Sequence, residues 1–244
     1  MNGYSDPRRE KYFTKSEWEG HTYVGIRRGI VIPDLNSVGR KYSGVNISVS
    51  SPVTWMNAAE VAFLKAEAKG VFGFNMGSGE AEDFYNEGIR LSFEERGASG
   101  ADAYVADAAS RPAAYTDPLG MYSAAAQSTI TIAWAPGADN FEENLERIIT
   151  QKWIAIFPLG VEAWSEHRRT GYPRLMPVVA DKSGGGVDVA QGARRLPYPV
   201  EEYQQNNANL QAAIQMLDAE QTNGNRTGDQ MGTRVWWDCK PYNN

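Results

Sequence analysis

The segment at residues 141–157 constrains the fold more than any other feature of this sequence. Apolar residues recur in it at the three- and four-residue spacing of an α-helix, which predicts a helix with one face in the protein core. The expected core positions are Leu145, Ile148, Ile149, Trp153 and Ile156. The charged residues between them are expected on a solvated face, namely Glu142, Glu143, Glu146, Arg147 and Lys152.

Two further long helices are predicted at residues 55–69 and 80–95. The first carries apolar residues on two stripes, which predicts burial over much of its circumference, and Gly70 is well placed to end it. The second places Phe84, Tyr85 and Ile89 on one face and has an acidic first turn. We therefore expect an antiparallel helical hairpin that resembles one tetratricopeptide-like unit, without a second copy in this sequence.

Shorter helices are predicted at residues 161–169 and 201–217, the latter buried through Tyr203, Leu210, Ile214 and Leu217. Residues 23–26, 45–49 and 129–134 have the pattern of short strands, and residues 181–192 look like an exposed, flexible loop. The sequence as a whole predicts one mainly α-helical domain over residues 1–244, with tetratricopeptide-like hairpins, long loops and a few short strands.

Charge and composition exclude several classes of function. A formal charge of −6 and a pI near 5.1 give no basic surface for nucleic acid. Residues 1–15 are too polar for a signal peptide, and no apolar run is long enough to cross a bilayer. The single Cys239, with His21 and His167, leaves little for a metal centre, so we expect no metal and no cofactor.

Glu162 and Glu166 are the strongest candidates for catalytic residues, because they lie four apart on one predicted helical face. Glycosidases use two carboxylates, but these flank the scissile bond from opposite sides, whereas neighbours on one helix lie side by side. A solvated pair bound by Arg168 and Arg169 is the expectation we prefer. His167 has no nucleophile motif to accompany it and is expected to be structural, so we predict no catalytic residue.

Aromatic residues are abundant, with 7 Trp, 12 Tyr and 8 Phe. Exposed rings with polar neighbours can stack on the apolar face of a sugar, and predicted loops are where such rings are expected. The candidate ligand-binding residues are Tyr104, Tyr115, Tyr122 and Trp134. Trp153, Trp164 and Tyr203 fall on apolar helical stripes and are expected in the core.

A series of short motifs resembles the SusD/RagB family, and in particular its SusD-like branch. In chain order they are DPR at 6–8, PVTWMNAAEVAFLKAEA at 52–68, YNEGI at 85–89, ITQKWIAIFPLGVEAWSEHRRTGYP at 149–173, RRLPYP at 194–199 and RVWWD at 234–238. Their order and number over nearly the whole chain carry the resemblance. Two of these stretches, RRTGYP at 168–173 and RRLPYP at 194–199, are rich in arginine. In these two arginine-rich motifs we expect the arginines to cap a helix end or bridge backbone carbonyls.

The resemblance implies a carboxyl-terminal half of a longer protein, whose amino-terminal half would carry the lipoprotein signal and lipid anchor. It also implies a non-catalytic surface protein of Bacteroidetes-type bacteria that takes part in polysaccharide utilisation. Such a protein binds a glycan or similar nutrient above a SusC-like TonB-dependent transporter in the outer membrane. An alternative function remains open, a helical-repeat module that binds protein and no glycan. A glycan-processing enzyme using Glu162 and Glu166 is a third hypothesis.

Overall fold

The computed structural model describes residues 1–219 and 228–238, and within these the chain is mainly α-helical. The elements, in chain order, are α1 Arg9–Tyr12, η1 Gly39–Lys41, α2 Ala58–Gly70, α3 Ala81–Glu95, α4 Ala101–Val105, η2 Ala138–Asn140, α5 Phe141–Ala155, α6 Gly160–Thr170, α7 Val200–Gln205 and α8 Asn207–Ala219. The expected fold class is therefore confirmed. Cys239 and most of the polar segment that follows α8 lie outside the described residues.

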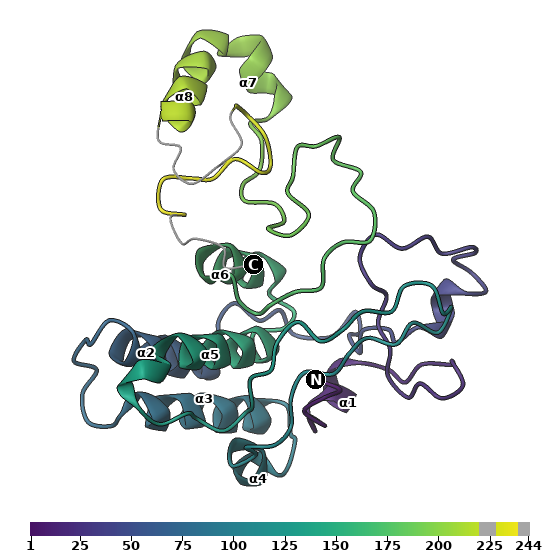
Figure 1. Ribbon diagram of the computed structural model, residues 1–244, viewed down its shortest axis with the longest axis vertical. Coiled ribbons are helices and arrows are strands. Elements are labelled where there is room, and N and C mark those ends of the chain that lie inside the picture. The colour runs from purple at the N-terminus through teal and green to yellow at the C-terminus, as the bar shows by residue number, and fades with distance from the viewer. Residues whose placement is uncertain (220–227, 239–244) are drawn as a thin grey trace.

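The centre of the molecule is a bundle of α2, α3 and α5, with α4 against α3 and α6 against α5 (Figure 1). Helices α2 and α3 begin where side chains can satisfy free backbone N–H groups. The Asn57 side chain accepts a hydrogen bond from the Glu60 backbone at the start of α2, and Glu80 and Asp83 form a capping box at the start of α3. Asn57 also donates to the Ala155 carbonyl at 3.0 Å, which joins the start of α2 to the end of α5.

The predicted hairpin of α2 and α3 is confirmed, and it is held together by close packing. Gly88 allows the Phe63 ring to lie against the backbone of α3, since a Cβ at Gly88 would lie 2.8 Å from that ring. Phe63 meets Tyr85 edge to face at 6.1 Å, and the Tyr85 hydroxyl donates to the Ile132 carbonyl at 2.7 Å. Both rings are fully buried, so they fix the distance between the two helices.

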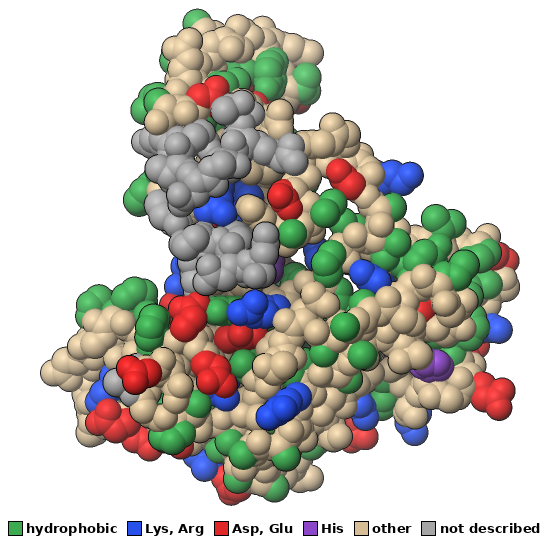
Figure 2. All heavy atoms as spheres, in the orientation of Figure 1, with side chains coloured by type: hydrophobic (Ala, Val, Ile, Leu, Met, Phe, Trp, Pro, Cys, Tyr) green, Lys and Arg blue, Asp and Glu red, His purple; other side chains and the backbone are tan. Residues whose placement is uncertain are grey.

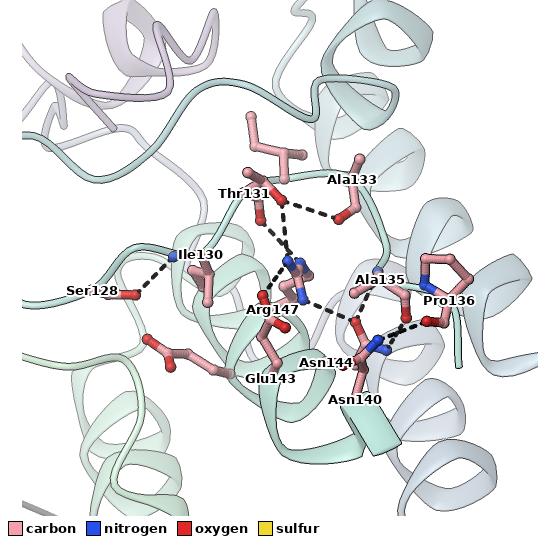
Figure 3. Close-up of polar contacts among 12 residues, drawn as sticks. Ser128, Ile130, Thr131, Ala133, Ala135, Pro136, Asn140, Glu143, Asn144 and Arg147 are labelled. Atoms are coloured by element: carbon pink, nitrogen blue, oxygen red, sulfur yellow. Dashed lines mark hydrogen bonds and ion pairs between the residues drawn. The ribbon is translucent and has the colours of Figure 1, made fainter. Parts of the chain in front are cut away.

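The predicted strands are wrong for the described residues, which contain isolated β-bridges and no extended ladder. Residues 129–134 show the reason, because side chains of α5 take the place of a partner strand (Figure 3). Arg147 donates to the carbonyl and the hydroxyl of Thr131 at 3.2 and 3.1 Å, and Asn144 bonds both the N–H and the carbonyl of Ala135. The segment therefore has its backbone groups satisfied without a sheet.

The prediction of a solvated charged face on α5 is also wrong for three residues. Glu146, Arg147 and Lys152 are all buried, and each is paired with an opposite charge. Glu143 is the exposed member of the predicted set. Helix α5 is thus enclosed on nearly all sides, because α2, α3, α6 and the segment at 129–136 surround it.

The helix expected at 201–217 is two helices, since Asn206 has φ −137° and ends α7 before α8 begins. Of the four predicted core positions only Leu210 is buried, and Tyr203 is 40% exposed. Among the described helices, α7 and α8 contact each other and no other helix, and they lie at one end of the long axis (Figure 1). Figure 2 shows acidic and basic side chains interspersed over the helical body in this view.

Candidate functional site

A pocket of about 710 Å³ lies where α5 ends and α6 begins. We call it the α6 pocket. The end of α5, the connection 156–159 and one side of α6 form its wall, and residues 171–177 and 190–193 complete it. Its size lies within the range of about 300–1,000 Å³ that is usual for ligand sites. A second pocket of about 490 Å³ shares Trp153, Phe157, Gln127 and Arg174 with it.

Aromatic side chains make up much of the wall of the α6 pocket. Trp153 from α5 and His167 from α6 meet nearly at right angles, with ring centroids 6.2 Å apart. The Trp164 indole also lines the pocket and donates through Nε1 to the Ala193 carbonyl at 2.8 Å, which fixes its orientation. The pocket thus offers flat apolar faces beside polar groups, an arrangement suited to sugar rings or other amphipathic ligands.

Charged residues lie among these rings. Arg28, Arg168 and Arg174 line the pocket, with Glu142 as its acidic residue. The Tyr172 hydroxyl donates to Glu142 at 2.7 Å, and burial raises the pKa of Tyr172, so this hydroxyl is a proton donor at neutral pH.

His167 is partly buried, and burial together with the positive charge of Arg194 lowers the pKa of its imidazole. The imidazole is therefore neutral at pH 7. Its Nδ1 atom is buried and has no hydrogen-bond partner among the described residues. The sequence predicts a structural role for His167, and its place in the wall between Trp153 and Arg168 gives it contact with the pocket as well.

A buried charge cluster beneath the pocket holds α6 in place. The Lys152 ammonium lies 3.1 Å from Glu162, 3.4 Å from Glu60 and 3.5 Å from Glu166, and its side chain is 1% exposed. Burial raises the pKa of Glu60, with Glu162 and Glu166 adding to the rise and Lys152 opposing it. One cation from α5 therefore ties α2 and α6 to the bundle.

The Glu162 and Glu166 pair is accordingly not the solvated pair expected from sequence. Glu166 is buried, and it also accepts from Arg169, which in turn binds Glu67 of α2 through both carboxylate oxygens. The predicted pairing with Arg169 is confirmed. Arg168 points elsewhere, and neither glutamate lines the α6 pocket.

The two arginine-rich motifs bind each other, because an arginine side chain of each donates to a backbone carbonyl of the other. Arg168 Nη1 donates to the Arg194 carbonyl at 3.0 Å, and the Arg194 guanidinium donates to the Arg168 carbonyl in the last turn of α6. Arg194 also pairs with buried Asp238. The expectation that these arginines bond backbone carbonyls at a helix end is confirmed for Arg168 and Arg194, whereas Arg169 pairs with Glu67 and Glu166 and Arg195 pairs with Asp229.

Three of the four candidate ligand-binding residues, Tyr104, Tyr122 and Trp134, line neither of the two large pockets. Tyr104 is in α4 rather than in a loop, is buried, and bonds Asp6 at 3.0 Å through its hydroxyl. Trp134 packs against the core next to Tyr85, beside a recess of about 90 Å³. The rings of Tyr104 and Trp134 stabilise the fold, and their positions offer little surface to a ligand.

Tyr115 and Tyr122 lie close together. Tyr115 forms an isolated bridge with Ala124, which brings Tyr122 into the same turn. Tyr115 lines the second pocket, and its hydroxyl donates to the Gly25 carbonyl at 3.0 Å. Tyr122 is partly buried, and its carbonyl accepts from Arg27 at 2.8 Å. Ligand binding by these four residues stays a prediction, and the structure gives Tyr115 the best access.

Trp153 and Trp164 are the residues that the sequence reasoning missed, because helical spacing assigned them to the core. They are partly buried and line the α6 pocket instead. A signal was present in the Phe157-Pro158-Leu159-Gly160 connection, since a proline and a glycine between two helices force a sharp change of direction. Rings close to such a corner face the space between the helices.

Comparison with known proteins gives a consistent result. A family model described as "SusD-like: Susd and RagB outer membrane lipoprotein" matches residues 1–238. No curated protein matches the chain. Among the helices of the described residues, none is both long and apolar enough to span a membrane.

Several solved structures are similar over nearly the whole chain. A SusD homologue from Bacteroides thetaiotaomicron is 53% identical, with a TM-score of 0.92 over 99% of this chain and 50% of that one. One from Bacteroides uniformis is also 53% identical, with a TM-score of 0.89 over 98% and 48%. A chitin-binding SusD homologue from Flavobacterium johnsoniae is 41% identical, with a TM-score of 0.87 over 99% and 48%. The chain spans about half the length of these proteins.

Proposed function

Because this chain belongs to the SusD-like family of SusD and RagB outer-membrane lipoproteins, we propose that it is part of a cell-surface protein that binds a glycan or similar nutrient. One similar structure is of a chitin-binding protein, which supports a carbohydrate as the ligand class. The α6 pocket is the site that best fits this function. It combines the flat rings of Trp153 and Trp164 with the hydrogen-bonding groups of His167 and Arg168.

Hydrogen bonds and ion pairs hold the pocket walls in place, and this supports a binding site that is already formed before the ligand arrives. Trp164 is fixed by its bond to Ala193, and Lys152 fixes α6 against α2 and α5. A ring that is already oriented loses little conformational entropy when a ligand stacks on it. The single observation that carries the proposal is this aromatic-lined pocket in a chain of this family.

The proposed function is non-catalytic. Glu162 and Glu166 are both bound to the Lys152 ammonium, and they lie outside the pocket wall. An inverting or retaining glycosidase needs two carboxyl groups facing the same glycosidic bond. Glu142, which does line the pocket, accepts from Tyr172, and the described lining includes no second acid to act with it.

The whole protein is proposed to work with a SusC-like TonB-dependent transporter and to be held at the outer membrane by lipid. The family description as an outer-membrane lipoprotein supports the anchor. Two acyl chains together are enough to hold a folded domain stably at a bilayer. Co-purification of the full-length protein with an outer-membrane barrel from detergent extracts would test the partnership.

Isothermal titration calorimetry of this chain with a panel of oligosaccharides tests the binding function. We expect Trp153→Ala and Trp164→Ala each to weaken binding by about ten-fold or more, because each removes a stacking face. Trp55→Ala is the matched control, since Trp55 is 90% exposed and lines none of the pockets described above. If the folded protein gave no heat of binding with any of the oligosaccharides, this would contradict the proposal and favour the protein-binding alternative.

A further inference from the structure

We propose that the α6 pocket selects a sugar that bears a carboxylate, and that the Arg168 guanidinium binds this group. The inference rests on the sugar-binding function proposed above and specifies its ligand class. It starts from the balance of charge around the pocket, which differs from that of the chain. The chain has a formal charge of −6, whereas three arginines and one glutamate line the pocket.

Two of these arginines lack an acidic partner. Arg174 is paired with Glu146, with Nε 3.2 Å from the carboxylate. Arg28 and Arg168 form no ion pair with any residue in the described ranges 1–219 and 228–238. Arg28 donates instead to the Met176 carbonyl at 3.0 Å. The pocket therefore has two arginines whose charged groups are in direct contact with no carboxylate of the described chain.

Arg168 is held in a fixed orientation. Its guanidinium carbon lies 4.2 Å from the Trp164 ring centroid and 4.8 Å from that of Trp237, so two indoles stack on it. Nη1 donates to the Arg194 carbonyl at 3.0 Å. The Nε atom is buried and has no hydrogen-bond partner among the described residues. Nη2 donates to no residue of the described chain, so it is the donor through which Arg168 can bind a ligand carboxylate with a charge-assisted hydrogen bond.

The surroundings of Arg168 add to the positive potential. Burial and the charge of Arg194 lower the pKa of Arg168, with Asp238 opposing them, and Asp238 is already bound to Arg194 at 2.6 Å. Arg194 and Arg28 also contribute to the lowered pKa of His167. Like charges held together are unfavourable, and an anionic group of a ligand would relieve that cost.

The rings in the same pocket point to a sugar rather than a small inorganic anion. A phosphate or sulfate ion needs donors but has no apolar face to place on Trp153. A uronic acid has both a carboxylate and an apolar ring face, and a pocket of about 710 Å³ accommodates a short oligomer of it. The carboxylate would bind at Arg168, and the neighbouring ring would stack on a tryptophan.

The test is calorimetric titration of this chain with two probes matched in size, a trimer of galacturonic acid and a neutral trimer of galactose. We expect the acidic trimer to bind at least about ten-fold more tightly than the neutral one. This preference should decrease as the salt concentration rises. In Arg168→Gln the acidic trimer should lose more affinity than the neutral trimer, so that its advantage disappears. The exposed Arg40→Gln is the control, and it should keep the preference.

Each result bears on a different claim. Equal or tighter binding of the neutral trimer would overturn the carboxylate inference and leave sugar binding intact. Binding of neither trimer, nor of any other oligosaccharide, would overturn both. An unchanged preference in folded Arg168→Gln would overturn the assignment to Arg168. Should this variant fail to fold, Arg28→Gln and the salt dependence of the unaltered chain decide, since both must weaken binding of the acidic trimer if two free arginines attract it.

Discussion

The Arg8 guanidinium binds the Asp6 carboxylate through Nε at 3.0 Å and Nη2 at 2.7 Å, and both side chains are fully buried. The pair lies where the amino-terminal segment crosses the helical bundle, because Arg8 also donates to Ser92 of α3 and Gln151 of α5 at 2.9 Å. Two residues apart in sequence, Asp6 and Arg8 thus join three distant parts of the fold. Their mutual neutralisation is what makes such deep burial tolerable.

Replacing Arg8 by methionine should destabilise the chain by about 3–5 kcal/mol, because the Asp6 carboxylate would remain buried without its counter-charge. Urea unfolding followed by circular dichroism measures the change. The double variant Asp6→Asn with Arg8→Met should recover part of the loss, since it removes both charges. If the double variant were as unstable as the sum of the two single variants, the two residues would not be coupled.

The close approach of α2 and α3 predicts that Gly88→Ala is harmful even though alanine is the better helix former. The added methyl group would lie 2.8 Å from the buried Phe63 ring. Overpacking of this kind costs about 1–3 kcal/mol. Gly160→Ala is the matched control, because a Cβ there meets nothing within 4 Å. Thermal unfolding should show a lower Tm for Gly88→Ala and no loss for Gly160→Ala.

The helices could be predicted from sequence because their signals are local. The spacing of Leu145, Ile148 and Ile149 identifies α5, and acidic residues and a capping box mark the start of α3. The break at Asn206 could also have been inferred, since two adjacent asparagines favour helix ends over helix interiors.

The buried charges and the pocket could not be predicted in the same way. Lys152 has the spacing of a solvated residue, and what buries it is Glu60 on α2 and the packing of α6, which are distant in sequence. The segment at 129–134 has the pattern of a strand, and only its contacts with Arg147 and Asn144 exclude a ladder. Tertiary partners decide such positions, and local pattern carries no information about them.

Glu60 gives the stability of the chain a defined pH dependence. Burial raises the pKa of its carboxyl in the folded state, so the folded chain binds a proton there at a pH where the unfolded chain has lost it. Stability should therefore fall as pH rises from the ordinary glutamate pKa, about 4.3, through the raised value. Above that window the folded state carries the full cost of the buried charge.

Glu60→Gln should remove this cost while keeping an oxygen that accepts from Lys152. We expect the variant to be more stable than the unaltered chain at pH 7 and nearly equal to it at about pH 3, where Glu60 is protonated in both states. Chemical unfolding over a pH series measures this. Glu87→Gln, on the exposed face of α3, should run parallel to the unaltered chain. A lower stability of Glu60→Gln at pH 7 would show that the ion pair with Lys152 outweighs burial.

Asn144 anchors the irregular segment at 129–136 to α5, as Figure 3 shows. Its side chain accepts from the Ala135 N–H at 3.1 Å and donates to the Ala135 carbonyl at 2.7 Å. Asn144→Leu keeps the volume but leaves both backbone groups without partners, which should cost about 1–3 kcal/mol for each group that stays buried. Hydrogen exchange should then accelerate at Ala135 and its neighbours while the helical bundle stays protected.

Glu143→Ala is the control, because its ion pair with Arg147 is solvent-exposed on the glutamate side and should contribute about 1 kcal/mol or less. Equal exchange rates in Asn144→Leu and the unaltered chain would mean that Arg147 alone holds the segment.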